Sequence, residues 1–198
     1  MKQMNDTKKI LDYETALNML YSFNLKEGDD WDKHCINVGN ISYIIADELS
    51  HYIDIDADKA KIFGLIHDFG RSVTHDPYRH GYEGYRLMKK LGYDDYARIC
   101  TCHSNGTYKI QDLAEYGLSP EDFFVETWEE KAVFIADSIE CKGEVIRHDD
   151  RIRNTIERYK FKNPEFIPVL ESKLEEFKQF DHDFYIITGK TVYQLFGI

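Results

Sequence analysis

Six side chains that can bind metal ions are spread along the chain around one adjacent histidine–aspartate pair. The set consists of His34, His67, Asp68, His80, His103 and Asp137. Imidazole nitrogens and carboxylate oxygens from separate segments are the ligands that a two-metal hydrolytic site requires. The sequence therefore predicts that these segments fold together around divalent cations.

The segments that carry these side chains have a helical pattern. Apolar residues recur at spacings of three and four, and strand-like alternation is nearly absent, so the predicted fold class is all-α. We expect a short helix over residues 16–23, followed by a loop over 25–30. The next helix carries an apolar stripe that includes Val38 and Ile45, and His34 lies on the same stripe.

Three further helices are predicted to place the central ligands near their ends. One starts at a cap, Asp56 or Asp58, and has His67-Asp68 in its last turn, with Gly70 just past its end. Another spans 81–91 and ends at Gly92. A third, capped by Asp94 or Asp95, leads to His103.

The C-terminal half adds one ligand helix and several packing helices. Thr127 and Glu130 form a capping box that starts the helix presenting Asp137. Asn163-Pro164 is a cap and first-turn proline for a helix with an apolar face, and the segment 184–196 is interrupted by Gly189. We expect one domain over residues 1–198, with a motif core at about 31–141 and C-terminal packing helices at about 150–198.

Composition limits the function. The 198 residues are 42% hydrophobic and 14% aromatic, which suffices for the core of one domain. The net charge of -11, from 25 Lys+Arg against 36 Asp+Glu, makes long nucleic acid an unlikely partner, while a small phosphate compound at a metal site stays compatible. Neither a signal peptide nor a membrane span is predicted, so the expected location is cytoplasmic, with the four cysteines as thiols.

Each ligand also has a simpler interpretation. A lone buried aspartate such as Asp137 is about as often a structural hydrogen-bonding residue, and an isolated His67-Asp68 pair is more often an ion pair or a cap. Single histidines are mostly exposed or satisfied core residues. His51, His75 and His148 show no pattern of partners. The joint occurrence of the six residues favours the metal interpretation.

The order His34, His67-Asp68, Asp137 resembles the ligand pattern of the HD superfamily of metal-dependent phosphohydrolases, over roughly residues 31–141. This resemblance implies an HD-domain-like helical bundle. Within the superfamily the chain is most similar to bacterial symmetrical diadenosine tetraphosphate hydrolases. Three segments carry that similarity: His80-Gly81, His103-Ser104 and Ala136-Asp-Ser-Ile-Glu140. Two features depart from it, namely Arg71 in place of a lysine and a longer stretch over 110–126.

The chemistry of the residues agrees with this resemblance. Asp68 is predicted to bridge two ions, one held also by His34, His67 and Asp137, and the other by His80 and His103. Iron, manganese, cobalt and zinc all suit such ligands. Metal-activated water then acts as the nucleophile.

Substrate contacts are predicted next to the ligands. Asp68 and Arg71 are the predicted catalytic residues, and the planar guanidinium of Arg71 suits a phosphate oxygen, although an ion pair explains it equally well. Asn105 and Thr107, just past His103, are predicted substrate contacts.

Three functions remain open from the sequence. The first is hydrolysis of a phosphoanhydride or phosphoester bond in a small nucleotide, with a dinucleoside tetraphosphate as the first substrate. The second is a nucleotide phosphomonoesterase with one metal ion, in which His80 and His103 contact phosphate or transfer protons. The third is a non-catalytic nucleotide-binding protein. The sequence also leaves open whether the protein is a homodimer.

Overall fold

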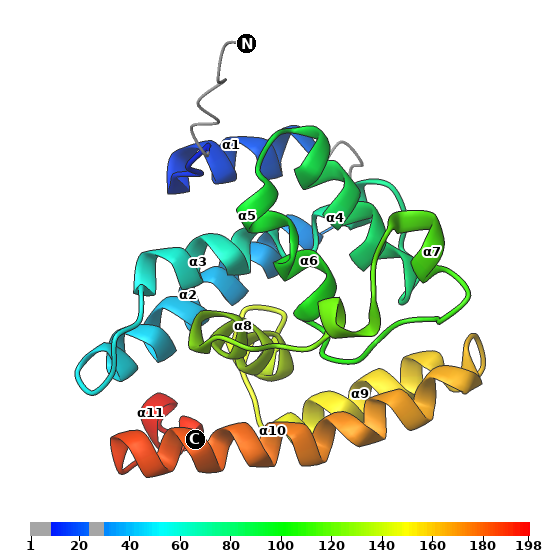
Figure 1. The fold of residues 1–198 in the computed structure, drawn as a ribbon. Coiled ribbons are helices and arrows are strands. Elements are labelled where there is room, and N and C mark those ends of the chain that lie inside the picture. Colours follow the sequence, from blue (N-terminus) through cyan, green and yellow to red (C-terminus); the bar gives the residue numbers. More distant parts are fainter. Residues whose placement is uncertain (1–8, 24–29) are drawn as a thin grey trace.

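The computed structural model describes residues 9–23 and 30–198, and helices dominate this part of the chain (Figure 1). In the N-terminal half they are α1 (Tyr13–Phe23), α2 (Trp31–Ser50), α3 (Ala57–Ile66), the 3-10 turn η1 (Phe69–Ser72), α4 (Arg79–Lys90), α5 (Asp94–Ala97) and α6 (Ile99–Cys102). In the C-terminal half they are α7 (Leu113–Tyr116), η2 (Pro120–Phe123), α8 (Trp128–Ile139), α9 (His148–Tyr159), η3 (Pro164–Phe166), α10 (Ile167–Thr188) and α11 (Val192–Phe196). The predicted all-α class is confirmed.

The two strands in the described residues form one small hairpin. The strands β1 (Glu140–Cys141) and β2 (Glu144–Val145) pair antiparallel, with Glu140 opposite Val145. This hairpin directly follows α8, so it turns the chain from the helix that carries Asp137 toward α9.

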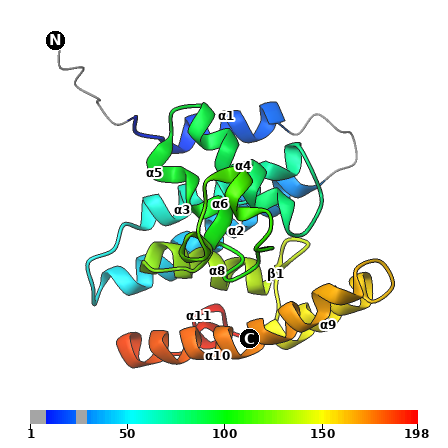
Figure 2. The same cartoon turned by 45° about the vertical axis from the view of Figure 1, so that its right-hand side comes forward.

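The helices lie in layers around α2, α3 and α8 (Figures 1 and 2). In both views α1, α4 and α5 lie on one side of this centre, and the long helices α9 and α10 lie on the other. No helix in the described residues is long and apolar enough to cross a membrane.

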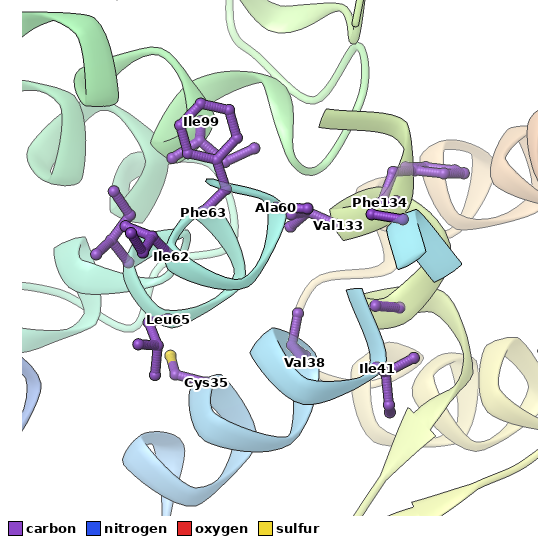
Figure 3. Close-up of a cluster of buried hydrophobic side chains, with 14 of the residues drawn as sticks. Cys35, Val38, Ile41, Ala60, Ile62, Phe63, Leu65, Ile99, Val133 and Phe134 are labelled. Atoms are coloured by element: carbon purple, nitrogen blue, oxygen red, sulfur yellow. The ribbon is translucent and has the colours of Figure 1, made fainter. Parts of the chain in front are cut away.

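The core forms where the apolar stripes of the central helices meet. Figure 3 shows Val38 of α2, Phe63 of α3 and Val133 of α8 within this cluster, and all three are buried. Their helices bury side chains at spacings of three and four, as the sequence pattern predicted. The core thereby fixes the relative positions of the three helices that carry or precede His34, His67-Asp68 and Asp137.

Two glycines allow α2 and α3 to cross in direct contact. A Cβ atom added to Gly64 would lie 2.5 Å from the Cα of Gly39, so neither position has room for a side chain. The crossing point lies close in sequence to both His34 and His67. Close backbone contact at this point therefore brings the two histidines to the same side of the helix pair.

The end of α3 differs from the prediction. The helix ends at Ile66, so His67 is its C-cap residue and Asp68 precedes η1 instead of lying in a helical turn. Gly70, predicted just past the end of this helix, lies inside η1 and is not among the positive-φ residues. Its physical role is close packing, because an added Cβ would lie 1.7 Å from the carbonyl oxygen of His80.

Other helix ends match the sequence more closely. Asp56 accepts a 2.9 Å hydrogen bond from the backbone N–H of Lys59, and Thr127 and Glu130 form the predicted capping box. Gly92 has a φ of 79° just past α4. The prediction that Asp94 or Asp95 caps the next helix is wrong, since both lie in the first turn of α5 behind the N-cap residue Tyr93.

Two predicted helix-end signals in the C-terminal part lie at helix ends. Asn163 precedes η3, whose first residue is Pro164, and α10 then runs to Thr188. Gly189, with a φ of 76°, separates α10 from α11. The predicted loop over residues 25–30 lies outside the described residues except for Asp30.

Candidate metal centre

The structure brings all six predicted ligands to one place between the central helices. His34 lies near the start of α2, His80 near the start of α4, and Asp137 near the end of α8, while His67, Asp68 and His103 follow the last residues of α3 and α6. The Nε2 atoms of His34 and His67 lie 4.0 and 3.7 Å from Asp68 Oδ2. Those of His80 and His103 lie 3.3 and 3.7 Å from Asp68 Oδ1. Asp68 is therefore the centre of the group.

The ligand atoms form two overlapping clusters that could each hold an ion. His34, His67 and Asp137 make one cluster, and His67, Asp68 and His103 make the other, with ligand atoms within 4.8 Å of one another in each. His67 belongs to both, whereas the sequence analysis assigned it to one ion. The role of the six residues as ligands, and the division between two ions, stay predictions.

Three of the histidines are fixed by the backbone of their own helical turns. The Nδ1 atoms of His67, His80 and His103 lie 2.6, 3.0 and 3.1 Å from the carbonyl oxygens of Gly64, Asp76 and Ile99. Because a carbonyl only accepts, each Nδ1 must carry the proton, and in the neutral ring Nε2 then presents a lone pair. Such anchoring of the second ring nitrogen is typical of metal-binding histidines.

His34 is held by a carboxylate instead. Its Nδ1 lies 2.5 Å from Glu140 Oε2, and its Nε2 lies 3.1 Å from Asp137 Oδ1. Glu140 is buried and also accepts hydrogen bonds from Asn37 (3.2 Å) and from the backbone N–H of Gly143 (2.7 Å). Burial lowers the pKa of His34, but the bonds to Asp137 and Glu140 outweigh this effect and raise it to about 9. Without a metal ion, His34 is therefore a cation between two carboxylates.

The other histidines are neutral. Burial, together with the charge of Arg71, lowers the pKa of His80 to about 4. Burial also lowers the pKa of His67 and, with the added effect of His67, that of His103. The pKa of Asp68 is lowered although burial acts to raise it, because the positive charge of Arg71 favours its charged form. Neutral imidazoles facing an ionised carboxylate are in the protonation state that metal binding needs.

Two buried atoms of this group lack hydrogen-bond partners in the described part of the chain, namely His67 Nε2 and Asp68 Oδ1. A buried polar atom without a partner costs free energy, so such atoms in a stable core indicate a missing ligand. An imidazole nitrogen and a carboxylate oxygen both suit a divalent cation. The residues therefore fit the metal that the sequence predicted.

Arg71 lies directly beside the group. Its Nε donates a short hydrogen bond to Asp68 Oδ2, and the two side chains form an ion pair. This is the ion pair that the sequence analysis weighed against a phosphate contact. Arg71 also lines both hollows at the site, so the rest of its guanidinium can still meet a ligand.

Asn105 and Thr107 lie close to His103 but are held by the protein. Asn105 donates to Glu176 Oε2 (3.0 Å) and accepts from the backbone N–H of Val125 (2.9 Å), while Thr107 donates to the carbonyl of Ser104 (2.7 Å). Both are buried, and neither lines the hollows at the site. These bonds give both side chains a structural role, and substrate contact by them stays a prediction.

Two hollows open onto the candidate metal centre. The smaller cavity, of about 130 Å³, is lined by His34, His80, His103 and Asp137 and by residues of α9 and α10. The larger cleft, of about 1160 Å³, is lined by Asp68 and by the start of α2, the β-hairpin and α9. Arg71, Arg151, Arg158 and Tyr159 line both. The volumes suit a small polar group in the cavity and a larger one in the cleft.

Sequence reasoning missed several residues around these hollows. They are Glu140, His148, Arg151, Arg158 and Lys173. Glu140 stands in the sequence at the end of the Ala136–Glu140 segment, so its position was a usable signal. The others are single residues on ordinary amphipathic helices, and only the packing of α9 and α10 brings them to the site.

Comparisons with known proteins agree with this geometry. The HD domain family matches residues 31–142, which is more than half of the chain. The protein therefore belongs to the HD domain family. The matched stretch contains all six candidate ligands and Glu140 but ends before α9.

Two relatives extend the comparison. An uncharacterized protein of Methanocaldococcus jannaschii is 30% identical over 145 residues, which are 72% of this chain and 83% of that protein. A tRNA (cytidine(56)-2'-O)-methyltransferase of Picrophilus torridus is 27% identical over 135 residues, 68% of this chain but 38% of the methyltransferase. No solved structure gives a significant match. Neither relative is described as a dinucleoside tetraphosphate hydrolase, so these comparisons reach the family and not the substrate.

Proposed function

We propose that the protein is a metal-dependent phosphohydrolase that cleaves a phosphoanhydride or phosphoester bond in a small nucleotide. One observation carries this proposal: the Nε2 atoms of His80 and His103 lie 3.3 Å apart and both face Asp68 Oδ1. Since their Nδ1 protons are bound to carbonyl oxygens, two lone pairs and an anionic oxygen converge. A cation satisfies all three atoms at once.

Each residue has a definite part in this function. His34, His67, Asp68 and Asp137 would hold one ion, and Asp68, His80 and His103 a second, with iron, manganese, cobalt and zinc as the suitable metals. Bound metal supplies a water of lowered pKa and neutralises charge on the phosphate. Glu140 orients His34, and Arg71 orients Asp68 and offers its remaining N–H groups to a phosphate oxygen.

The geometry favours this function over a phosphomonoesterase with a single ion. In that alternative His80 and His103 either contact phosphate directly or transfer protons, and a direct contact requires a proton on Nε2. Their lowered pKa values and their Nδ1 bonds leave Nε2 unprotonated near neutral pH, so it would repel a phosphate oxygen. Two ions per chain are therefore the proposed state.

The experiment is a substrate screen with purified, metal-analysed protein. Dinucleoside tetraphosphates, mononucleotides and cyclic dinucleotides are incubated with the protein, and the products are identified by chromatography and mass spectrometry. We expect hydrolysis of a phosphoanhydride, with symmetric cleavage of diadenosine tetraphosphate to two diphosphates as the first expected result. Hydrolysis that persists in Asp68→Asn would contradict the proposed site.

A non-catalytic nucleotide-binding protein is the remaining alternative. The Asp68→Asn variant distinguishes the two functions, provided that circular dichroism shows it to be folded. Loss of hydrolysis in the folded variant supports catalysis. The contrary outcome is a wild type that binds nucleotides and yet hydrolyses none of them, whether it holds one or two metal ions per chain. In that case the binding function replaces the catalytic one.

A further inference from the structure

The helices α9 and α10 add a cationic wall to the smaller cavity. Both follow the stretch matched by the HD domain family, and both lie on one side of the central helices (Figure 2). From α9 come Arg151 and Arg158, and from α10 comes Lys173. On its other side the same cavity is lined by residues of the candidate metal centre. The wall therefore faces the place where a phosphate would react.

Two of these cations have only neutral partners in the described residues. Arg158 donates to Thr155 Oγ1 (3.2 Å), and Lys173 donates to the carbonyl of Ser104 (2.6 Å). Neither makes an ion pair with a carboxylate of the described chain. Arg151 donates to the carbonyl of Glu140 (2.7 Å), and its Nη2 lies 3.9 Å from Asp137 Oδ1.

Cations elsewhere on the same helices behave differently. On α9, Arg153 pairs with Asp150 at 2.9 Å, and on α10, Lys178 pairs with Glu175 at 2.7 Å. These pairs lie on the exposed faces and do not line the cavity. In a chain with 36 acidic residues, cations that face a cavity and lack an acidic partner indicate an anionic ligand.

The electrostatics of the wall point the same way. Burial lowers the pKa of Lys173 to about 8, although Asp137 and Glu176 act to raise it. The pKa of Arg158, an exposed residue at the edge of the cavity, is lowered by partial desolvation and by the charge of Arg151. The charged forms are thus held in unfavourable surroundings. An anion beside them would offset this cost.

The volumes of the cavity and the cleft suit different parts of one ligand. The cavity of about 130 Å³ is several-fold smaller than the cleft of about 1160 Å³, so it suits phosphate groups better than a nucleoside. The cleft of about 1160 Å³ has room for a nucleoside, and Arg71, Arg158 and Tyr159 line both spaces.

We propose that Arg151, Arg158 and Lys173 form a subsite for a second phosphate group, next to the phosphate that reacts at the metal centre. This inference rests on the proposed function and narrows it, because a second phosphate joined to the reacting phosphate by a bridging oxygen makes the substrate a phosphoanhydride and not a phosphomonoester. Arg71 and the candidate ligands face the reacting phosphate. The cations on the opposite side of the cavity can therefore bind the second phosphate group.

Binding of two inorganic probes tests the subsite without hydrolysis. Calorimetric titrations of the metal-loaded protein compare methylenediphosphonate, which has two phosphorus groups and resists hydrolysis, with inorganic phosphate. We expect the wild type to bind the diphosphonate at least about tenfold more tightly than phosphate. Metal content is measured after each titration, so that removal of metal by the diphosphonate is detected.

Matched variants assign this preference to the wall. Arg158→Gln and Lys173→Gln should each weaken diphosphonate binding about tenfold and change phosphate binding less than about twofold. The controls Arg153→Gln and Lys178→Gln, on the same helices, should change neither. Arg158→Lys should recover part of the loss. Circular dichroism and thermal unfolding establish that each variant is folded. If Lys173→Gln does not fold, the Arg158 variants alone provide the test.

The outcomes separate this inference from the proposed function. Equal losses for both probes, or no loss in the folded variants, would overturn the second-phosphate subsite. Hydrolysis without any diphosphonate preference leaves the proposed function standing and removes the subsite. If the protein prefers the diphosphonate through these cations but hydrolyses no nucleotide, the subsite stands and the proposed function is removed.

Discussion

The stretch from α2 to α8 and the pair α9–α10 supply different chemistry to the same site. In the first region the functional groups are imidazoles and carboxylates, fixed by backbone carbonyls and by Glu140. In the second they are long cationic side chains bound to neutral oxygens. The first arrangement tolerates little movement, whereas the second can adjust to a ligand. We infer that the first region determines whether the protein acts on phosphate, and the second which phosphate compound it accepts.

The largest expected effect comes from the centre of the first region. Asp68→Asn removes the charge on which four histidines converge and leaves Arg71 without its partner. We expect loss of bound metal and a fall in hydrolysis of more than about a thousandfold. Metal analysis and product release measure both. The control Asp47→Asn, on the exposed face of α2, should keep wild-type values.

The next effect concerns the backbone that holds Asp68. Gly70→Ala would place a Cβ 1.7 Å from the carbonyl oxygen of His80 and 2.7 Å from the N atom of Gly84. We expect a loss of unfolding free energy of more than about 3 kcal/mol, measured by urea unfolding. In Gly92→Ala the added Cβ meets nothing within 4 Å, so only the strain of φ 79° remains, at about 1 kcal/mol. Equal losses would show that close packing at η1 is not what places Asp68.

A smaller effect is expected where the first region holds His34. Glu140→Gln keeps the shape of the side chain but removes the charge 2.5 Å from His34 Nδ1. Metal affinity should fall about 10- to 100-fold, as measured by competition with a chelator. Glu144→Gln, on the exposed end of the adjacent strand, is the control. Unchanged affinity in Glu140→Gln would mean that His34 needs no such support.

The last effect is a pH dependence of the metal-free protein, which develops gradually over several pH units. The pKa of His80 is about 4 in the fold against 6.5 in the unfolded chain, because of burial and the charge of Arg71. The unfolded chain thus binds this proton first as the pH falls. The unfolding free energy should therefore decrease between pH 6.5 and 4, by up to about 1.4 kcal/mol per unit from this residue.

Two variants check the sign of this effect. In His80→Gln the acidic slope should become shallower, and an unchanged slope would contradict the neutral state of His80. His34 has the opposite sign, since its pKa is raised to about 9. Its contribution is complete below pH 6.5 and is lost as the pH rises through 9. His34→Gln should therefore change the slope of the unfolding free energy with pH only on the alkaline side.

The sequence predicted the first region well and the second hardly at all. Helical spacing and caps such as Asp56 and Thr127 are local signals, so they located the helices that carry the six candidate ligands. The close packing of Gly70 against the backbone of His80 could not be predicted, because no local sequence pattern encodes it. Arg158 and Lys173 look like ordinary surface cations in the sequence. Only the absence of an acidic partner beside a cavity distinguishes them, and this requires the fold.

The most direct test of the account is metal reconstitution with ion counting. Protein stripped by a chelator is titrated with manganese or iron, and bound ions and hydrolysis of a nucleotide phosphoanhydride are measured on the same samples. The account predicts no hydrolysis without metal and full hydrolysis at two ions per chain, with His103→Ala binding fewer. Hydrolysis by the metal-free protein, or full activity with one ion, would contradict it.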